Sequence, residues 1–252
     1  MRQEAEGQTA LRLRQGAQRA ERLDCAVAGR FVTGMERQEA QREAHACGVS
    51  ASFDGGWDEA ERVQVCFHPS DVPAAFTAVW LEITWAAKFA RVGHSDLLGS
   101  LMALGMDRSL FGDLIVQDGT AYLLAMPEAA RSLPQEWHEA GHTAIRVRAL
   151  DEAPHFTPPQ GQMMRDTVAS LRLDCVLAAG MSVSRARAAE IIRQGLVQRN
   201  HMPEERVDAL LEAGDLLSVR GFGRIRLNEI GGRTRKDRLS IQLEVFKREK
   251  ST

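Results

Sequence analysis

The sequence lacks the features of a secreted or membrane-embedded protein. No stretch approaches the roughly 18 to 20 uncharged apolar residues that a membrane helix needs. Residues 1–7 lack the apolar core of a signal peptide. The four cysteines, Cys25, Cys47, Cys66 and Cys175, form no C-x-x-C pair, which fits a reducing compartment. We therefore expect a soluble, cytoplasmic protein with no membrane partner.

Signatures of cofactor-dependent and RNA-modifying enzymes are also missing. No G-x-G-x-x-G loop follows a strand-like segment, and the segment R-L-D at 172–174 belongs to a different motif described below. His94, Asp96, Asp107 and Asp113 could form an acid-base set, but a helix cap, an exposed turn and the start of a strand explain them more simply. We expect no enzymatic activity, no cofactor and no small-molecule substrate.

One metal-binding pattern is present. Residues 138–142 read H-E-A-G-H and satisfy H-E-x-x-H, in which two histidines one helical turn apart bind zinc and the glutamate acts as general base. The pattern needs a continuous helix, yet a glycine lies inside it and residues 143–148 alternate as in a strand. The next histidine, His155, lies in a proline-rich segment. A zinc hydrolase using His138 and His142 is therefore a remote alternative, and we expect no bound metal.

Charge is unevenly distributed along the chain, although the formal net charge is only -2. Residues 1–165 carry 16 Lys and Arg against 22 Asp and Glu, a net charge of -6, whereas residues 166–252 carry 16 against 12, a net charge of +4. A basic domain on an acidic chain concentrates attraction for phosphate on one surface. Ordinary solvated charge is the alternative explanation.

Hydrophobic periodicity predicts an α+β protein in four parts. Residues 1–60 are rich in Arg, Glu, Gln and Ala and predict a helical N-terminal region. Residues 61–151 predict an α+β domain, which resembles RNA-recognition-motif domains in its order of elements. Residues 152–165 contain three prolines and a glycine and predict a linker. Residues 166–252 form the last domain.

The middle domain shows a regular succession of periodicities. Its predicted elements are a strand at 79–85, a helix at 96–104 capped by Ser95, a hairpin of 114–116 and 122–125 around Asp118-Gly119, a helix at 127–133 and a strand at 143–150. The order β-α-β-β-α-β is that of ferredoxin-like domains. No strand carries the aromatic-rich pattern with which RNA-recognition motifs stack bases, so RNA binding does not follow from this order.

The last domain begins with a predicted pair of short helices. Thr167 can cap a helix that runs to Ala179, and Ser184 can cap a second helix at 185–194. The elements predicted after them are a strand at 196–198, a tight turn at Asn200-His201 and a strand at 216–220.

Arginines at the start of the second helix indicate a phosphate ligand. Ser184-Arg-Ala-Arg187 places two guanidinium groups in the first helical turn, where free backbone N–H groups and the helix dipole favour an anion. Positive charge there is mildly unfavourable for the protein alone. A bound phosphate, which can accept bidentate arginine hydrogen bonds, explains the arrangement.

These segments resemble the S-four RNA-binding domain, named after a protein of the small ribosomal subunit. The matching motifs are Leu171-Arg-Leu-Asp174, Ser184-Arg-Ala-Arg187, Ile191-Ile-Arg-Gln-Gly-Leu-Val197, Asn200, Gly214-Asp215 and Val219-Arg220. The resemblance implies that arginines of both helices face RNA, with Asn200 near the turn. The family usually has glycine after this asparagine, where this chain has His201, so the turn type stays open.

A basic extension follows the S-four motifs. Arg220-Gly-Phe-Gly-Arg224 and the stretch at 233–238 predict either a glycine-rich hairpin with an exposed basic tip or a further phosphate-contacting loop. Phe222 could stack on a base or pack beside a sheet. The residues predicted to bind RNA are Arg172, Ser184, Arg185, Arg187, Arg193, Gln194, Arg199, Asn200, Arg220, Arg224, Arg226, Arg233, Arg235 and Lys236.

Motifs in the middle domain resemble a more specific family. His94-Ser-Asp-Leu-Leu-Gly99, Leu104-Gly-Met-Asp-Arg108 and Gly112-Asp-Leu-Ile-Val116 resemble the RNA-binding domain of YlmH-type proteins, which carry a C-terminal S-four domain. This resemblance implies a non-catalytic factor that binds structured RNA, namely large-subunit rRNA and tRNA, on the large ribosomal subunit with peptidyl-tRNA during rescue of stalled ribosomes. Because other S-four proteins are RNA-modifying enzymes, an rRNA- or tRNA-modifying enzyme is the alternative.

Overall fold

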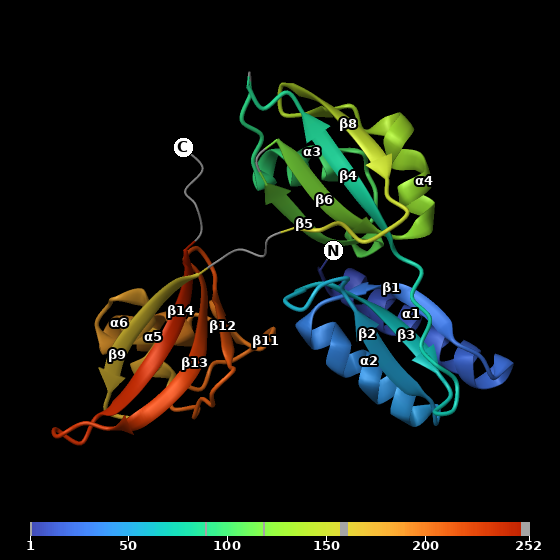
Figure 1. Ribbon diagram of the computed structural model, residues 1–252. Helices are drawn as coiled ribbons and strands as arrows, with labels where there is room; N and C mark the ends of the chain where they lie inside the picture. Colours follow the sequence, from blue (N-terminus) through green and yellow to red (C-terminus); the bar gives the residue numbers. More distant parts are fainter. Residues whose placement is uncertain (1, 89, 118, 157–160, 248–252) are drawn as a thin grey trace. The chain divides into compact units, whose positions relative to one another are not determined.

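The computed structural model (Figure 1) divides the chain into two compact units, residues 1–155 and 156–252. The described residues are 2–88, 90–117, 119–156 and 161–247. Asp118 of the predicted hairpin turn, residues 157–160 of the predicted linker and residues 248–252 lie outside them. The mixture of helices and antiparallel sheets in both units confirms the predicted α+β class.

The N-terminal part of the first unit packs α1 and α2 against a small sheet of order β1-β3-β2. Its elements are α1 (Arg2–Leu23), β1 (Val27–Val32), α2 (Gly34–Ala46), β2 (Ser50–Asp54) and β3 (Val63–His68). The prediction of a helical region at 1–60 missed β1 and β2. Both strands pair with β3, which lies beyond the predicted region, so local periodicity could not reveal them.

The middle part of the first unit has the predicted β-α-β-β-α-β order plus a short additional strand. Its elements are β4 (Val79–Trp85), α3 (His94–Ala103), η1 (Arg108–Leu110), β5 (Phe111–Gln117), β6 (Thr120–Ala125), α4 (Pro127–Glu136), β7 (Glu139–Ala140) and β8 (Thr143–Ala149). The sheet order β5-β6-β4-β8-β7 places the first strand between the third and the fourth, as in ferredoxin-like domains. Gly93, not Ser95, precedes the first turn of α3, and the Asp96 carboxylate accepts a hydrogen bond from Gly93 N at 2.9 Å.

Helices α3 and α4 cover one face of this sheet. Leu81 and Ile83 of β4 are fully buried in one cluster with Leu97 of α3 and Leu133 of α4. Because strand side chains alternate between faces, Trp80 points to the opposite face. A Cβ atom on Gly56 would lie 2.7 Å from the Trp80 ring, so the N-terminal part covers that end of the opposite face.

Hydrogen bonds of Asp113 and of the half-buried Arg62 hold the two parts of the first unit together. Asp113 of β5 accepts hydrogen bonds from the indole Nε1 of Trp57 at 3.3 Å and from the backbone nitrogens of Glu61 and Arg62 at 2.8 and 3.1 Å. The Arg62 guanidinium donates from Nε to the Phe111 carbonyl at 2.8 Å. These contacts link the segment before β3 to the start of β5.

Helices α5 and α6 of the second unit pack on one face of a long sheet. The elements are β9 (Gln162–Val168), α5 (Leu173–Met181), α6 (Arg185–Arg193), β10 (Val197–Arg199), β11 (Met202–Pro203), β12 (Leu216–Val219), β13 (Gly223–Arg233) and β14 (Leu239–Lys247). The sheet order is β11-β10-β12-β13-β14-β9. Gly180 of α5 lies so close to the sheet that a Cβ atom there would be 2.7 Å from Ile225.

Two predictions for the second unit are wrong. Thr167 does not cap a helix but lies in β9, and α5 begins at Leu173. The predicted linker at 152–165 is also too long, since its last residues form the start of β9. This strand pairs with β14, so that Val168 lies opposite Leu239, and no local pattern shows a partner that far along the chain.

Candidate nucleic-acid interface

A buried carboxylate organises the arginines at the start of α5 and α6. The side chain of Asp174 is only 5% exposed and accepts hydrogen bonds from Arg172 Nε at 3.1 Å and from Arg185 Nε at 2.8 Å. Burial alone would raise the pKa of the Asp174 carboxyl, but the hydrogen bonds from Arg172 and Arg185 outweigh it and lower the pKa. One ionised group therefore orients two guanidinium groups from two helices.

The first turn of α6 has the predicted cap. The Ser184 hydroxyl accepts a hydrogen bond from Arg187 N at 3.2 Å, so it satisfies one of the free backbone donors of the turn. Arg187 is about half exposed and donates to Glu190 at 2.6 Å. Because Arg185 is also about half exposed, both guanidinium groups can reach a ligand outside the protein.

The last turn of α6 continues this exposed surface. Arg193 and Gln194 are both exposed. Gln194 donates to Glu190 at 3.2 Å, the same carboxylate that accepts a hydrogen bond from Arg187. We call Arg172, Ser184, Arg185, Arg187, Arg193 and Gln194 the helical face.

Arg199 and Asn200 have a different arrangement, because both hold a second buried carboxylate. Asp215 accepts hydrogen bonds from Arg199 Nη2 and Asn200 Nδ2, both at 2.7 Å, and its side chain is 6% exposed. Arg199 also donates to the Leu210 carbonyl at 2.9 Å. Burial acts to raise the pKa of Asp215, but these hydrogen bonds and one from Glu212 N lower it. The polar groups of Arg199 and Asn200 therefore stabilise the loop within the protein.

The turn at Asn200-His201 resolves the turn type that the sequence left open. Asn200 and His201 have φ values of 49° and 68°, and Arg199 and Met202 are paired on either side of them. Positive φ at both central residues defines a type I′ hairpin turn. His201 thus occupies the left-handed conformation in which the S-four family usually has glycine.

The glycine-rich loop joins β12 to β13, and the arginines of β13 lie on the sheet face away from the helices. Ile225 and Leu227 face the core, so Arg224 and Arg226 point to the opposite side. Arg224 lies over the Phe246 ring, 5.4 Å from its centroid. Phe222 packs against the core of the unit, which favours packing over base stacking, while Arg220 is exposed.

The predicted basic tip is the turn between β13 and β14. Arg233 donates to Asp237 at 2.6 Å, while Arg235 and Lys236 are exposed. Arg238 was not among the predicted residues. It is exposed and donates from Nε to the Thr167 hydroxyl at 3.0 Å, which links the tip to β9.

The structure thus divides the predicted residues into the helical face, the loop around Asp215, the outer face of the sheet and the hairpin tip. Sequence reasoning noted Asp174 and Asp215 only as parts of motifs and missed their role as buried anchors. A signal was available for Asp174, since an acidic residue within an apolar helix start requires a hydrogen-bonding or oppositely charged partner if it is buried.

The H-E-x-x-H pattern does not form a helix. Glu139 and Ala140 form β7, and Gly141 has a φ of 62°. His138 bonds to the Gln135 carbonyl at 2.7 Å. The helical geometry that the zinc motif requires is therefore absent, and no cluster of three or more potential metal ligands occurs within the described part of the chain.

The three aspartates of the alternative acid-base set each have a local structural role. Asp96 caps α3, Asp107 accepts a hydrogen bond from Ser109 N at 2.8 Å, and Asp113 holds the segment before β3. Each carboxylate has a structural partner, as the simpler explanation predicted.

In the part of the chain that the structure describes, no helix has the length and apolarity to cross a membrane.

Comparison with known proteins finds two matching domains, one in each unit of the chain. The family model described as "Putative RNA-binding domain in YlmH" matches residues 72–153, and the S4 domain, the S-four module above, matches residues 171–217. The chain is 33% identical over 200 residues to the ribosome-associated protein quality control protein P2 of Bacillus subtilis (strain 168), covering 78% of each chain.

A solved structure aligns with part of this chain at low identity. The cell division protein ylmH from Streptococcus pneumoniae aligns with a TM-score of 0.48 and 19% identity, over 58% of this chain and 91% of that one. The match to the Bacillus protein is the stronger finding, because it extends over most of both sequences. With an RNA-binding domain of the YlmH type followed by an S4 domain, this chain belongs to the YlmH-type RNA-binding proteins.

Proposed function

We propose that this protein is a non-catalytic factor that docks on the large ribosomal subunit carrying peptidyl-tRNA, in the rescue of stalled ribosomes. Its ligands are large-subunit rRNA and tRNA, and it acts in the cytoplasm. The observation that carries the proposal is the helical face, where one buried carboxylate orients Arg172 and Arg185 beside Arg187.

The chemistry of the helical face suits phosphate. Guanidinium groups donate bidentate hydrogen bonds to phosphate oxygens, and the first turn of α6 contributes backbone N–H groups and the positive end of its dipole. Double-stranded RNA is recognised largely through its shape and its backbone. A rigid set of arginines therefore favours a structured RNA over a flexible strand.

The name of the Bacillus relative supports the choice of the ribosome as partner. Sedimentation of the tagged protein with separated ribosomal subunits, followed by crosslinking and sequencing of the bound RNA, tests this choice. We expect the protein in the large-subunit fraction, with crosslinks to rRNA and tRNA. Migration with the small subunit alone would contradict the proposal.

The helical face itself is tested by Arg185→Ala together with Arg187→Ala. We expect weaker RNA binding and a shallower dependence of log K on log salt, by roughly 0.7 to 0.9 for each lost phosphate contact. The control combines Arg14→Ala and Arg42→Ala, which remove the same charge from exposed positions in the first unit. Equal losses in both variants would indicate a nonspecific charge effect.

A further inference from the structure

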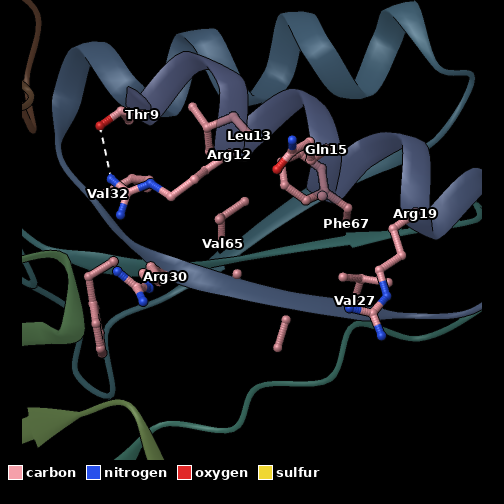
Figure 2. A pocket seen from close by; sticks show the side chains of 14 residues that line it. Thr9, Arg12, Leu13, Gln15, Arg19, Val27, Arg30, Val32, Val65 and Phe67 are labelled. Carbon is pink, nitrogen blue, oxygen red and sulfur yellow. Dashed lines mark hydrogen bonds between the residues drawn. The ribbon is translucent and has the colours of Figure 1, made fainter. Parts of the chain in front are cut away.

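A cavity of about 230 Å³ lies between helix α1 and strand β1 in the N-terminal part (Figure 2). Its walls are formed by one side of α1 from Thr9 to Arg19 and by the whole of β1. None of the residues predicted to bind RNA lines it. The cavity is therefore separate from the helical face and from the proposed function.

The interior of the cavity is apolar. Leu13, Val65 and Phe67 contribute side chains that are at most 5% exposed, and Figure 2 shows Val65 and Phe67 in the space between α1 and β1. The aromatic rings of the lining belong to Phe31 and Phe67, which are 2% and 1% exposed. An aliphatic side chain fits such an interior, whereas a nucleic acid base finds no exposed ring on which to stack.

Positive charge surrounds this apolar interior. Arg12 and Arg30 lie at one end and Arg19 at the other (Figure 2). Arg12 and Arg30 share the Asp107 carboxylate, to which their Nη1 atoms donate at 3.2 and 3.3 Å. Arg19 is exposed and has no protein partner within the described residues. The surroundings of the cavity therefore carry three guanidinium groups and one carboxylate, which leaves two positive charges in excess.

The spacing of the arginines excludes a small anion as the full occupant. Arg12 and Arg19 are seven residues apart on one helix, which corresponds to about 10 Å at 1.5 Å per residue. An extended peptide covers this distance with about three residues. In addition, β1 pairs with β3 alone among the described strands, so its outer edge can accept backbone hydrogen bonds from an extended chain.

We call this cavity together with the surrounding Arg12, Arg19 and Arg30 the α1–β1 groove. We propose that this groove binds a short acidic segment of a partner protein. One aliphatic side chain of that segment occupies the cavity, and carboxylates on either side pair with Arg19 and with the Arg12 and Arg30 pair. The charge of the groove is opposite to that of the first unit as a whole, since residues 1–155 carry 15 Lys and Arg against 22 Asp and Glu, a net charge of -7. An acidic ligand is therefore attracted at this groove and repelled elsewhere on the unit.

The first test measures binding of a fluorescein-labelled peptide, Glu-Glu-Leu-Glu-Glu, to the full-length protein by fluorescence anisotropy. The comparison peptides are Glu-Glu-Ser-Glu-Glu, which lacks the aliphatic anchor, and Gln-Gln-Leu-Gln-Gln, which lacks the charges. We expect each comparison peptide to bind at least fivefold more weakly. No binding of the first peptide at 1 mM, or equal binding of all three, overturns the proposal.

The second test locates the site with Arg19→Glu and the matched control Arg14→Glu. Arg14 is exposed on the same helix but does not line the groove. We expect Arg19→Glu to weaken peptide binding at least tenfold and Arg14→Glu by less than twofold. Equal effects would mean that the peptide senses only the overall charge, and would overturn the proposal.

A labelled uridine decamer distinguishes a protein ligand from RNA at the same groove. We expect Arg19→Glu to leave the affinity for the decamer within twofold of the wild type. A tenfold loss of decamer binding, with peptide binding unchanged, would assign the groove to RNA and contradict the proposal. Substitutions in the helical face are expected to weaken RNA binding and to leave peptide binding unchanged. A failure of the proposed function can therefore be distinguished from a failure of this proposal.

Discussion

Two pairs of arginines, one pair in each unit, have opposite roles in this protein. In the first unit, Arg62 and Arg108 turn inward and donate to the backbone carbonyls of Phe111 and Gly112. In the second unit, Arg172 and Arg185 lie at the surface with one buried carboxylate between them. The first pair therefore stabilises the fold through hydrogen bonds to the backbone, whereas the second pair presents positive charge at the surface.

The surroundings account for this difference. Burial lowers the pKa of Arg62, and burial together with the nearby positive charge of Arg62 lowers the pKa of Arg108 to about 10. The hydrogen bond from Arg172 to Asp174 raises the pKa of Arg172 instead. A guanidinium that gives its hydrogen bonds to carbonyls has few left for a ligand, whereas one oriented by a carboxylate keeps donors available.

Arg62→Ala provides the strongest test of the inward role. We expect the free energy of unfolding of the first unit to fall by about 3 kcal/mol, because the hydrogen bonds from the charged guanidinium to the Phe111 and Arg108 carbonyls are lost and these carbonyls are left without that donor. Chemical denaturation measures the loss, with exposed Arg42→Ala as the control. RNA binding should remain unchanged. If the Arg62→Ala variant kept full stability but bound RNA more weakly, Arg62 would have a binding role and not the structural role that we infer.

Asp174→Asn tests whether the carboxylate orients the outward arginines. We expect the affinity for structured RNA to fall by about fivefold, which is about 1 kcal/mol. The salt dependence should not decrease, because the number of guanidinium groups is unchanged. Filter binding at several salt concentrations measures both quantities. If Asp174 merely weakened phosphate binding by its negative charge, the affinity would rise instead.

Acid should destabilise the second unit through Asp174 and Asp215. The pKa of each carboxyl is lower in the folded protein than its ordinary value near 4. Their stabilising contribution is therefore complete above about pH 5 and is lost as the pH falls below about 4. Urea unfolding at pH 7, 5 and 3.5 measures this loss. The Asp215→Asn variant should lose less stability between pH 5 and 3.5 than the wild type.

The hairpin tip should have the smallest effect. Arg235 and Lys236 are exposed, and no buried carboxylate among the described residues orients them. Replacing both by Ala should weaken RNA binding by only about two- to threefold, since mobile charges lose side-chain entropy on binding. The measurement is the same filter-binding titration. A loss larger than that of the Arg185 and Arg187 pair would show that the tip, and not the helical face, dominates the interface.

Elements with strong local signals could be predicted from the sequence. The capping serine of α6 is Ser184, as expected, and β4 spans the predicted residues 79–85. By contrast, β1, β2 and β9 were missed. Each of these strands is completed by a partner that lies later in the chain, and residues 162–168 alone carry no alternation strong enough to distinguish a strand from a helix.

The candidate site shows the same division. The amino-acid sequence by itself determined the α+β class, the order of elements in the middle domain and the identity of the arginines at the start of α6. Only the tertiary structure decided that Asp174 accepts hydrogen bonds from two arginines and that Arg199 and Asn200 donate to Asp215. The inward direction of Arg62 was likewise decided by the tertiary structure. Helix caps and periodicity depend on neighbouring residues, whereas burial and the partner of a charge depend on segments that folding brings together.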